Sequence, residues 1–428
     1  MENNKIKWGC IQPLTGGMYI GAYEAIGHHA EWILSYAGLD SVTTKNGEIV
    51  DAGNEYNLLK WLEKNGAKVP YYNIMERGMF CDTIHDTNPK ISLDGVESTP
   101  DYKDIDIVVA VPVCSGLSMS TRAGEETKQS RNCNMEWLAY YTLNVIKPKM
   151  YCFENAPGLV GVRGETVRME LEDIARNAGY SIMYFKTDTK FHHNCQRRPR
   201  TFVVFTKWRD GKQQTPPLFE YEHDTMLIPE FFSTISESAS QQEPVKSSIH
   251  NYIAIDFMKQ KYGEDNWLNA LKINNVIQHI IANELDDFKK FVENCDYAEK
   301  DKEKTIKYID HIVYKKSLGL NYYGADASIV FDLFPAVQFR SIPNMLHYSG
   351  KRFCTIREYL SLMGMPEDFV LYGNSNCLAK IGQNVPAGTA KFIVSQMVNI
   401  IHNWDSVERN EETNVLLQDN ISQKTRRI

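Results

Sequence analysis

The sequence predicts an α/β protein with a largely parallel sheet, followed by a charged helical region. Over the first half of the chain, short apolar runs alternate with helix-like segments, which is typical of parallel sheets covered by helices. Residues 105–113 are almost continuously apolar, as expected for a strand buried on both faces. After residue 205 the alternation stops, and residues 251–314 read as mostly helical.

The elements follow from apolar periodicity and from turn residues. The expected strands cover residues 5–12, 30–36, 105–113, 150–153, 182–185 and 201–205. The expected helices cover residues 19–26, 55–64, 135–146, 167–177, 355–363 and 387–401. Residues 231–248 are rich in Ser, Glu and Gln, so we expect a linker or exposed loop there. Residues 406–428 are polar, and we expect them to fray.

Composition narrows the class of protein. The 428 residues, 43% of them hydrophobic, allow one large domain and a smaller one. No apolar run is long enough to span a membrane, and the start lacks the apolar core of a signal peptide. The nine cysteines form no CxxC pair, which indicates free thiols in a reducing compartment, so we expect a cytoplasmic protein. The net charge of −7 mildly disfavours a nucleic-acid partner, although a basic cleft can exist on an acidic protein.

Chemically active residues follow two of the expected strands. Cys114 stands at the end of the apolar run 105–113, and Ser118 follows in a polar segment. Glu154 and Asn155 come directly after the strand expected at 150–153. Open α/β sheets bind ligands at the carboxyl ends of their strands, so we expect the thiol and the carboxylate at one site.

Three further polar side chains lie just before the strand expected at residues 201–205. Gln196, Arg198 and Arg200 alternate, which places the two guanidinium groups on one side of an extended chain.

A thiolate can add to carbon 6 of cytosine, and a carboxyl group can share a proton with ring nitrogen 3. Carbon 5 then becomes nucleophilic enough to take a methyl group, while arginines can hold the base carbonyl and a phosphate.

The order and spacing of these motifs resemble the DNA (cytosine-5) methyltransferase family. Cys114 falls on the nucleophile of that family, Glu154 on its carboxyl partner, and Gln196, Arg198 and Arg200 on a third motif. Residues 352–366 resemble the ninth motif of the family, and residues 381–386 resemble the tenth, which completes the cofactor pocket.

The resemblance implies a methyltransferase fold that depends on S-adenosyl-L-methionine. Such a fold is a doubly wound, mostly parallel sheet with a smaller, largely helical target-recognition domain inserted before the final helices. The implied partner is double-stranded DNA with the cytosine flipped out, since a thiol cannot reach carbon 6 of a stacked base.

The implied catalytic residues are Cys114, Glu154, Arg198 and Arg200. The implied cofactor contacts are Thr15, Gly16, Gly17, Met18, Tyr36, Pro112, Asn384 and Val385, and the implied substrate contacts are Ser118, Asn155 and Gln196.

We expect residues 1–207 and 346–404 to form the catalytic and cofactor-binding domain of a monomer, with its C-terminal block folded back onto the large part. Residues 208–345 are assigned to target recognition, because the catalytic motifs lie outside them, and residues 405–428 to a polar tail. The cationic and polar candidates for reading DNA in this region are Lys315, Lys316, Asn321 and Arg340.

Plainer interpretations exist for each motif. Taken alone, Cys114 fits a small core side chain, Glu154 a solvated turn residue, and Asn384 a cap of the helix expected near 387. The glycine pair at 16–17 fits a tight turn. The histidines at 192–193 invite a metal site, but no further ligands lie at a suitable spacing, so we expect no metal.

Two other functions stay open. An RNA cytosine-5 methyltransferase fits the acidic balance of residues 206–351, and methylation of duplex DNA against tRNA separates the two. A catalytically inactive relative that only binds nucleic acid or a partner enzyme fits the shortened glycine motif at 13–18. Cofactor binding separates this last alternative, because an inactive scaffold need not bind S-adenosylmethionine.

Overall fold

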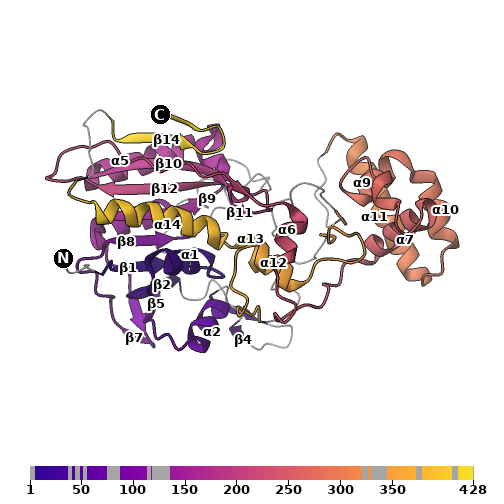
Figure 1. Ribbon diagram of the computed structural model, residues 1–428, viewed down its shortest axis with the longest axis horizontal. Helices are drawn as coiled ribbons and strands as arrows, with labels where there is room; N and C mark the ends of the chain where they lie inside the picture. Colours follow the sequence, from indigo (N-terminus) through magenta and orange to yellow (C-terminus); the bar gives the residue numbers. More distant parts are fainter. Residues whose placement is uncertain are drawn as a thin grey trace. The chain divides into compact units, whose positions relative to one another are not determined.

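The computed structural model describes residues 5–36, 41–43, 49–51, 55–74, 87–112, 117, 135–320, 326–328, 345–372, 378–406 and 413–427. The chain forms two compact units. The first consists of Met1–Met226, Leu362–Tyr372 and Gln383–Ile428, and the second of Leu227–Ser361 and Gly373–Gly382. The first unit is α/β and the second is largely helical (Figure 1). No helix within the described ranges combines the length and the apolar character that a membrane span needs.

An eleven-stranded sheet organises the first unit (Figure 1). Its central strands β9, β8, β1, β2 and β5 are parallel, β12 is antiparallel to both neighbours, and each edge ends in an antiparallel pair. The predicted α/β class is therefore confirmed. In spatial order the strands are β15 (Lys424–Arg427), β14 (Val415–Asp419), β10 (Tyr180–Asp188), β12 (Pro199–Lys207), β9 (Met150–Asn155), β8 (Ile107–Ala110), β1 (Trp8–Ile11), β2 (Trp32–Tyr36), β5 (Tyr71–Ile74), β6 (Ile91–Leu93) and β7 (Val96–Glu97).

Helices cover both faces of this sheet. On one face, α1 (Gly17–Ile26) lies against α14 (Ala387–His402). A methyl group on Gly21 would come within 2.4 Å of the Ala387 carbonyl oxygen, so the two backbones are in close contact. The chain from Gln383 onward thus packs within the first unit. The other face is covered by α5 (Glu165–Ala178) and by helical residues 135–146, whose last turn is a π-helix.

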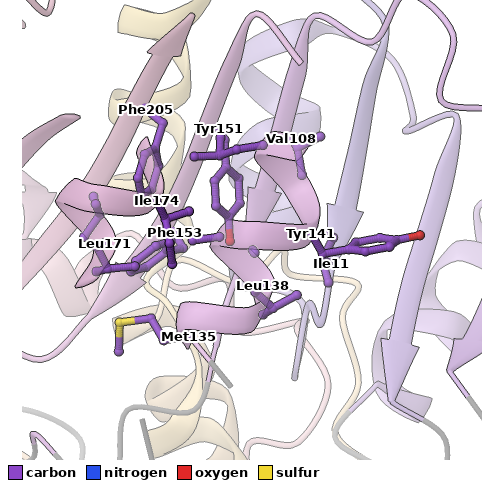
Figure 2. Packing of buried hydrophobic residues seen from close by; sticks show 14 of the residues in the cluster. Ile11, Val108, Met135, Leu138, Tyr141, Tyr151, Phe153, Leu171, Ile174 and Phe205 are labelled. Atoms are coloured by element: carbon purple, nitrogen blue, oxygen red, sulfur yellow. The ribbon is translucent and has the colours of Figure 1, made fainter. Parts of the chain in front are cut away.

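The core under α5 shows why the central strands are apolar (Figure 2). The rings of Tyr151 and Phe205, from β9 and β12, stack with centroids 5.3 Å apart. Leu171 and Ile174 of α5 pack over the same cluster and are at most 4% exposed. Close packing of this kind holds the strands in one register, which in turn fixes where each strand ends.

The C-terminal residues correct one expectation. We expected residues 406–428 to fray, but Val415–Asp419 forms β14 and pairs in parallel with β10. Lys424–Arg427 forms β15 and closes the edge as an antiparallel strand. The apolar side chains at 415–417 are at most 6% exposed, so their burial offsets the polar character of the rest of the segment.

Several short elements complete the first unit. A hairpin joins β6 and β7 through Asp94 and Gly95, whose φ angles of 50° and 81° suit the tight turn between antiparallel strands. The remaining elements are α2 (Tyr56–Lys64), β3 (Ser41–Thr43), β4 (Ile49–Asp51), β11 (His192–Asn194), β13 (Asp224–Thr225) and the 3₁₀ turns Pro157–Val160, Val162–Gly164 and Thr189–Phe191.

The second unit is a helical bundle with its own core. Its apolar residues include Phe257, Trp267, Phe288 and Ile309, each at most 4% exposed. The predicted helical character of residues 251–314 is confirmed. The helices are α6 (Ile228–Ser233), α7 (Ile249–Tyr262), α8 (Trp267–Ala270), α9 (Val276–Asn283), α10 (Leu285–Asn294) and α11 (Glu299–Ser317), together with α12 (Ile356–Leu362) and α13 (Leu378–Gln383), whose last residues are assigned to the first unit.

The predicted linker at 231–248 is wrong at its first residues. Phe231 and Phe232 belong to α6 and are 6% and 8% exposed, so they are part of the packed unit. A Ser- and Glu-rich composition hid two aromatic side chains that bury a large apolar area.

Candidate active site

The polar residues of interest gather at the carboxyl edge of the parallel strands. Ile11 of β1 pairs with Ala110 of β8, and Ala110 pairs with Phe153 of β9, so the three strands end at nearly the same level. The chain leaves β1 toward β2 on one side, while β8 lies on its other side. Such a switch in strand order opens a crevice at the carboxyl edge, where α/β sheets bind ligands.

Glu154 forms an ion pair at this edge with Arg200. Because β12 runs antiparallel to β9, its first residues lie beside the last residues of β9, and Phe202 pairs with Glu154. The Arg200 Nε lies 2.5 Å from the Glu154 Oε1, and the Glu154 side chain is only 5% exposed. A nearly buried carboxylate held by a guanidinium has a fixed direction.

Arg198 has different partners from Arg200. Its backbone N–H donates to the Asp188 Oδ1 at 2.8 Å, and its Nη2 donates to the Asn384 carbonyl oxygen at 2.9 Å. Arg198 is 3% exposed. It therefore ties the start of β12 to the block that precedes α14.

The glycine turn after β1 is connected to that same block. Gly16 has a φ of 111°, and a methyl group on Gly17 would lie 1.8 Å from the Val385 carbonyl oxygen. The Gly17 N–H donates to the Asn384 Oδ1 at 2.8 Å, and Asn384 is 1% exposed. Only glycine fits this close approach. Asn384 thus joins the glycine turn, through its side chain, to Arg198, through its carbonyl.

Two of the predicted substrate contacts are engaged within the protein. The Gln196 Nε2 donates to the Leu362 carbonyl oxygen at 2.6 Å, and its N–H donates to the Asn194 Oδ1 at 2.7 Å. The Asn155 Oδ1 accepts a hydrogen bond from the Ala156 N–H at 2.8 Å. Both side chains are fully buried, so they shape the edge on which Glu154 stands.

Several predicted site residues lie outside the part of the chain that the structure describes. Cys114 and Ser118 are among them, and so is the side chain of Tyr36. The described residues on each side of Cys114 are Pro112 and Leu117. Pro112 follows β8, and a methyl group on Gly158 would lie 2.6 Å from the Leu117 carbonyl oxygen. The chain on both sides of the predicted nucleophile is therefore at the edge that carries Glu154. The other predicted cofactor contacts, Thr15 and Met18, are fully buried.

The described cysteines near this edge are held as neutral thiols. Burial, and secondly the Glu55 carboxylate, raise the pKa of Cys10 well above its usual value. Burial and then the Glu154 carboxylate raise the pKa of Cys152 in the same direction, and burial raises that of Cys195 to about 12. A thiol with such a pKa is a poor nucleophile at neutral pH.

Sequence reasoning missed three residues that organise the edge. Asp188 and Asn194 are 2% and 5% exposed, and each accepts a backbone N–H of the Gln196–Arg198 motif. Asp and Asn beside a predicted strand often bind a nearby backbone in this way, a signal that was present at both positions. Glu55, which is 3% exposed at the start of α2, accepts a hydrogen bond from the Tyr71 hydroxyl.

The histidine pair shows an ordinary polar network. The His192 Nδ1 lies 2.7 Å from the Glu222 Oε2, and its Nε2 lies 2.8 Å from the Thr187 Oγ1. Among the residues that the structure describes, no group of three or more His, Cys, Asp or Glu side chains is placed to hold a metal ion.

Comparisons with known proteins identify the family to which the chain is similar. The model of the C-5 cytosine-specific DNA methylase family matches residues 67–399. Type II methyltransferase M1.HphI of Haemophilus parahaemolyticus is 22% identical over 321 residues, which cover 73% of this chain and 74% of the relative. A putative type II methyltransferase of Methanocaldococcus jannaschii, M.MjaORF1200P, is 26% identical over 174 residues. That match covers 39% of this chain and 45% of the relative.

Solved structures that match the chain include the methyltransferase EhMeth of Entamoeba histolytica, with a TM-score of 0.49 and 10% identity, over 93% of this chain and 99% of that one. Another is a putative DNA modification methyltransferase encoded within an Escherichia coli prophage. Its TM-score is 0.45 and its identity 15%, over 93% of this chain and 99% of that one.

Proposed function

The chain belongs to the C-5 cytosine-specific DNA methylase family, and on that premise we propose that it methylates carbon 5 of a cytosine in duplex DNA through a covalent bond from Cys114. The observation that carries the proposal is the Glu154–Arg200 pair, which stands at the end of β9 beside the strand that leads to Cys114. The proposed chemistry uses Cys114, the Glu154–Arg200 pair and the glycine turn after β1.

The Cys114 thiolate is the nucleophile in this proposal. It forms a bond from sulfur to carbon 6 of the cytosine, and the displaced electron pair increases the electron density at carbon 5. Glu154 shares a proton with ring nitrogen 3, which relieves the charge that builds up on the ring. After carbon 5 takes the methyl group, a water molecule accepts the proton of carbon 5. The electron pair of that C–H bond restores the double bond between carbons 5 and 6 and expels the Cys114 thiolate. The neutral thiols Cys10, Cys152 and Cys195 do not compete for this role.

Arg200 acts on Glu154 in this scheme. Its Nε, 2.5 Å from the carboxylate, fixes the direction of the acid. Its Nη1 donates to the Pro199 carbonyl oxygen at 2.7 Å, so Nη2 is the proposed donor to the base carbonyl. Arg198, predicted as catalytic, holds the start of β12 against Asn384, so its contribution is to place Arg200. Gln196 and Asn155 are buried and hydrogen-bonded within the protein, so in this proposal they hold the backbone near Glu154 in place. Ser118 is the remaining proposed substrate contact.

S-adenosyl-L-methionine is the proposed methyl donor, and when bound it supplies an electrophilic methyl group on a sulfonium. The residues present fit it, because the glycine turn opens at the switch in strand order and the first turn of α1 carries no acidic side chain. The Gly17 N–H is taken by the Asn384 Oδ1, and the next N–H groups at the positive end of α1 are the proposed donors to an anionic group such as a carboxylate. The proposed lining consists of Thr15, Gly16, Gly17, Met18, Tyr36, Pro112, Asn384 and Val385.

In this proposal the target cytosine must leave the base stack of the duplex. Carbon 6 of a stacked cytosine is shielded by its neighbours, so the base is flipped out to meet Cys114 and Glu154. The proposed target-recognition part is residues 208–345. Lys315 and Lys316 lie in the last turn of α11, whereas Asn321 and Arg340 lie outside the described residues. The relatives are type II methyltransferases by name, so we further propose that this enzyme works in the cytoplasm as a monomer and belongs to a restriction-modification system.

Methyl transfer from isotope-labelled S-adenosylmethionine tests the proposal. The purified protein is given duplex DNA of mixed sequence or tRNA, and the modified positions are mapped by bisulfite sequencing. We expect 5-methylcytosine in DNA at a defined sequence and none in tRNA. Label confined to tRNA favours the RNA enzyme, and a protein that does not bind the cofactor in calorimetry favours an inactive scaffold; either result overturns the proposal.

A further inference from the structure

One helix of the second unit sorts its charges by side. The 19-residue helix α11 (Glu299–Ser317) carries six lysines and four carboxylates. Its buried side chains, Thr305, Ile309 and Ile312, fix the side that faces the bundle core. Because successive helical residues turn by about 100°, Lys300, Lys304 and Lys307 fall within about 60° of one another on the side away from that core. We name these three residues the lysine seam.

The lysine seam is open to solvent. All three side chains are exposed, and that of Lys307 is 81% exposed. The one ion pair that the described residues give the seam is a weak one, between Lys307 and Glu303, whose atoms lie 3.7 Å apart. Surface pairs of this kind contribute little and are easily exchanged for another anion.

The carboxylates of α11 lie outside the seam. By the same helical geometry each of the four is turned by at least about 40° from the nearest seam lysine. Asp310 is held by Lys289 of α10, whose Nζ lies 2.7 Å from its carboxylate. Glu299 lies 3.8 Å from Lys302, which is outside the seam. The seam is therefore a narrow cationic strip on a protein whose net charge is −7.

We propose that the lysine seam binds the phosphate backbone of the duplex DNA on which the enzyme acts. The proposal rests on the proposed function, and it adds a contact that the catalytic edge does not supply. Lys300 and Lys307 are seven residues apart, or about 10 Å along the helix. Phosphates of one strand follow one another every 3.4 Å of duplex axis, so the seam spans about three of them.

The chemistry of the seam favours phosphates over bases. Lysine is a compact charge on a flexible stem, which suits a phosphate oxygen and gives little discrimination between base edges. An acidic protein repels DNA over most of its surface, so a local cationic strip has a large effect on where the duplex rests. The seam therefore contributes affinity and position, and sequence is read elsewhere.

Salt dependence of DNA binding tests the seam. The seam variant replaces Lys300, Lys304 and Lys307 by Gln, and its binding to a labelled duplex is followed by fluorescence anisotropy between low and moderate salt. Each phosphate contact contributes about −0.9 to the slope of log K against log salt, so loss of three contacts makes the slope less negative by about 2.7. The matched control replaces Lys246, Lys272 and Lys290, three exposed lysines of the same unit outside the seam, by Gln and keeps the net charge of the seam variant.

The expected result is a less negative slope in the seam variant and a slope near that of the wild type in the control, with equal melting temperatures. An equal change of slope in both variants overturns the proposal, because it shows a general effect of charge. An unchanged slope in the seam variant also overturns it. The proposed function is tested apart, by methylation of DNA with the wild type. If the wild type methylates DNA while the seam variant keeps its slope, only the seam is wrong; if the wild type does not methylate DNA, the proposed function is wrong whatever the slopes show.

Discussion

The two units use charged side chains in different ways. At the carboxyl edge of the sheet, Glu154 and Arg198 are 4% and 3% exposed and are bonded to other parts of the chain. In the helical bundle, Lys289 and Asp310 are 36% and 54% exposed. A buried charge is part of the packing and has one geometry, whereas an exposed charge mainly sets the electrostatic field around the surface. The same type of substitution should therefore have very unequal effects in the two units.

The largest effect is expected for Glu154→Gln. The amide keeps the shape of the side chain and can still accept a hydrogen bond from Arg200, but it has no acidic proton for a ring nitrogen. We expect the methylation rate at saturating substrate to fall at least about a hundredfold, the lower range for loss of a general acid. Rates from initial-velocity assays provide the measurement.

Glu172→Gln is the matched control for that change. Glu172 is a half-buried carboxylate of α5 that accepts a hydrogen bond from the Tyr184 hydroxyl, away from the edge. It should leave the rate within about twofold of the wild type, as changes outside the site do. Equal rates in the two variants would remove Glu154 from the proposed chemistry.

A smaller effect, on cofactor affinity and folding, is expected for Gly17→Ala. The added methyl group meets the Val385 carbonyl oxygen at 1.8 Å, and a backbone atom cannot move aside as a side chain does. We expect a loss of about 1–3 kcal/mol in the free energy of unfolding. Affinity for S-adenosylmethionine in calorimetry should fall with it.

Gly161→Ala offers the comparison for that prediction. Gly161 has a φ of −97°, and its added methyl group would meet the nearest atom at an ordinary 3.5 Å. This variant should keep the stability and affinity of the wild type. If both glycine variants behave alike, the close approach of Gly17 to Val385 has no energetic meaning.

The smallest effect is expected for Lys289→Ala in the bundle. The pair with Asp310 is exposed, and such pairs contribute at most about 1 kcal/mol to stability. Chemical denaturation of the full chain should therefore show a change within that limit. A loss of several kcal/mol would erase the contrast between the two units.

The sequence predicted those parts of the fold that local patterns determine. The apolar run before Cys114 and the alternation around it were enough to locate β8, β9, α5 and α14 to within a few residues. The motif residues Glu154 and Arg200 were found as separate signals. Their pairing was not predictable, because it depends on β12 running antiparallel to β9, a choice made by contacts far apart in the chain.

The errors have a common physical cause. Residues 415–417 and the aromatic pair at 231–232 are short apolar groups within polar segments, and neither has a periodicity long enough to detect. Each is fixed by a non-local partner: β14 pairs with β10, and the aromatic pair is buried by the rest of its unit. The hairpin of β6 and β7, which was not among the expected elements, differs from these two errors. Its Asp94-Gly95 turn is a local signal that the sequence contains.

Covalent trapping on DNA that carries 5-fluorocytosine tests the central claim most directly. Fluorine cannot leave carbon 5 as a proton does, so the bond between sulfur and carbon 6 persists after methyl transfer. With S-adenosylmethionine present, we expect the wild type to form an adduct that survives denaturing electrophoresis, and peptide mapping to place it on Cys114. Cys114→Ser should form none, because a hydroxyl is a far poorer nucleophile than a thiolate at neutral pH. An adduct that persists in Cys114→Ser, or that maps to another cysteine, contradicts the account.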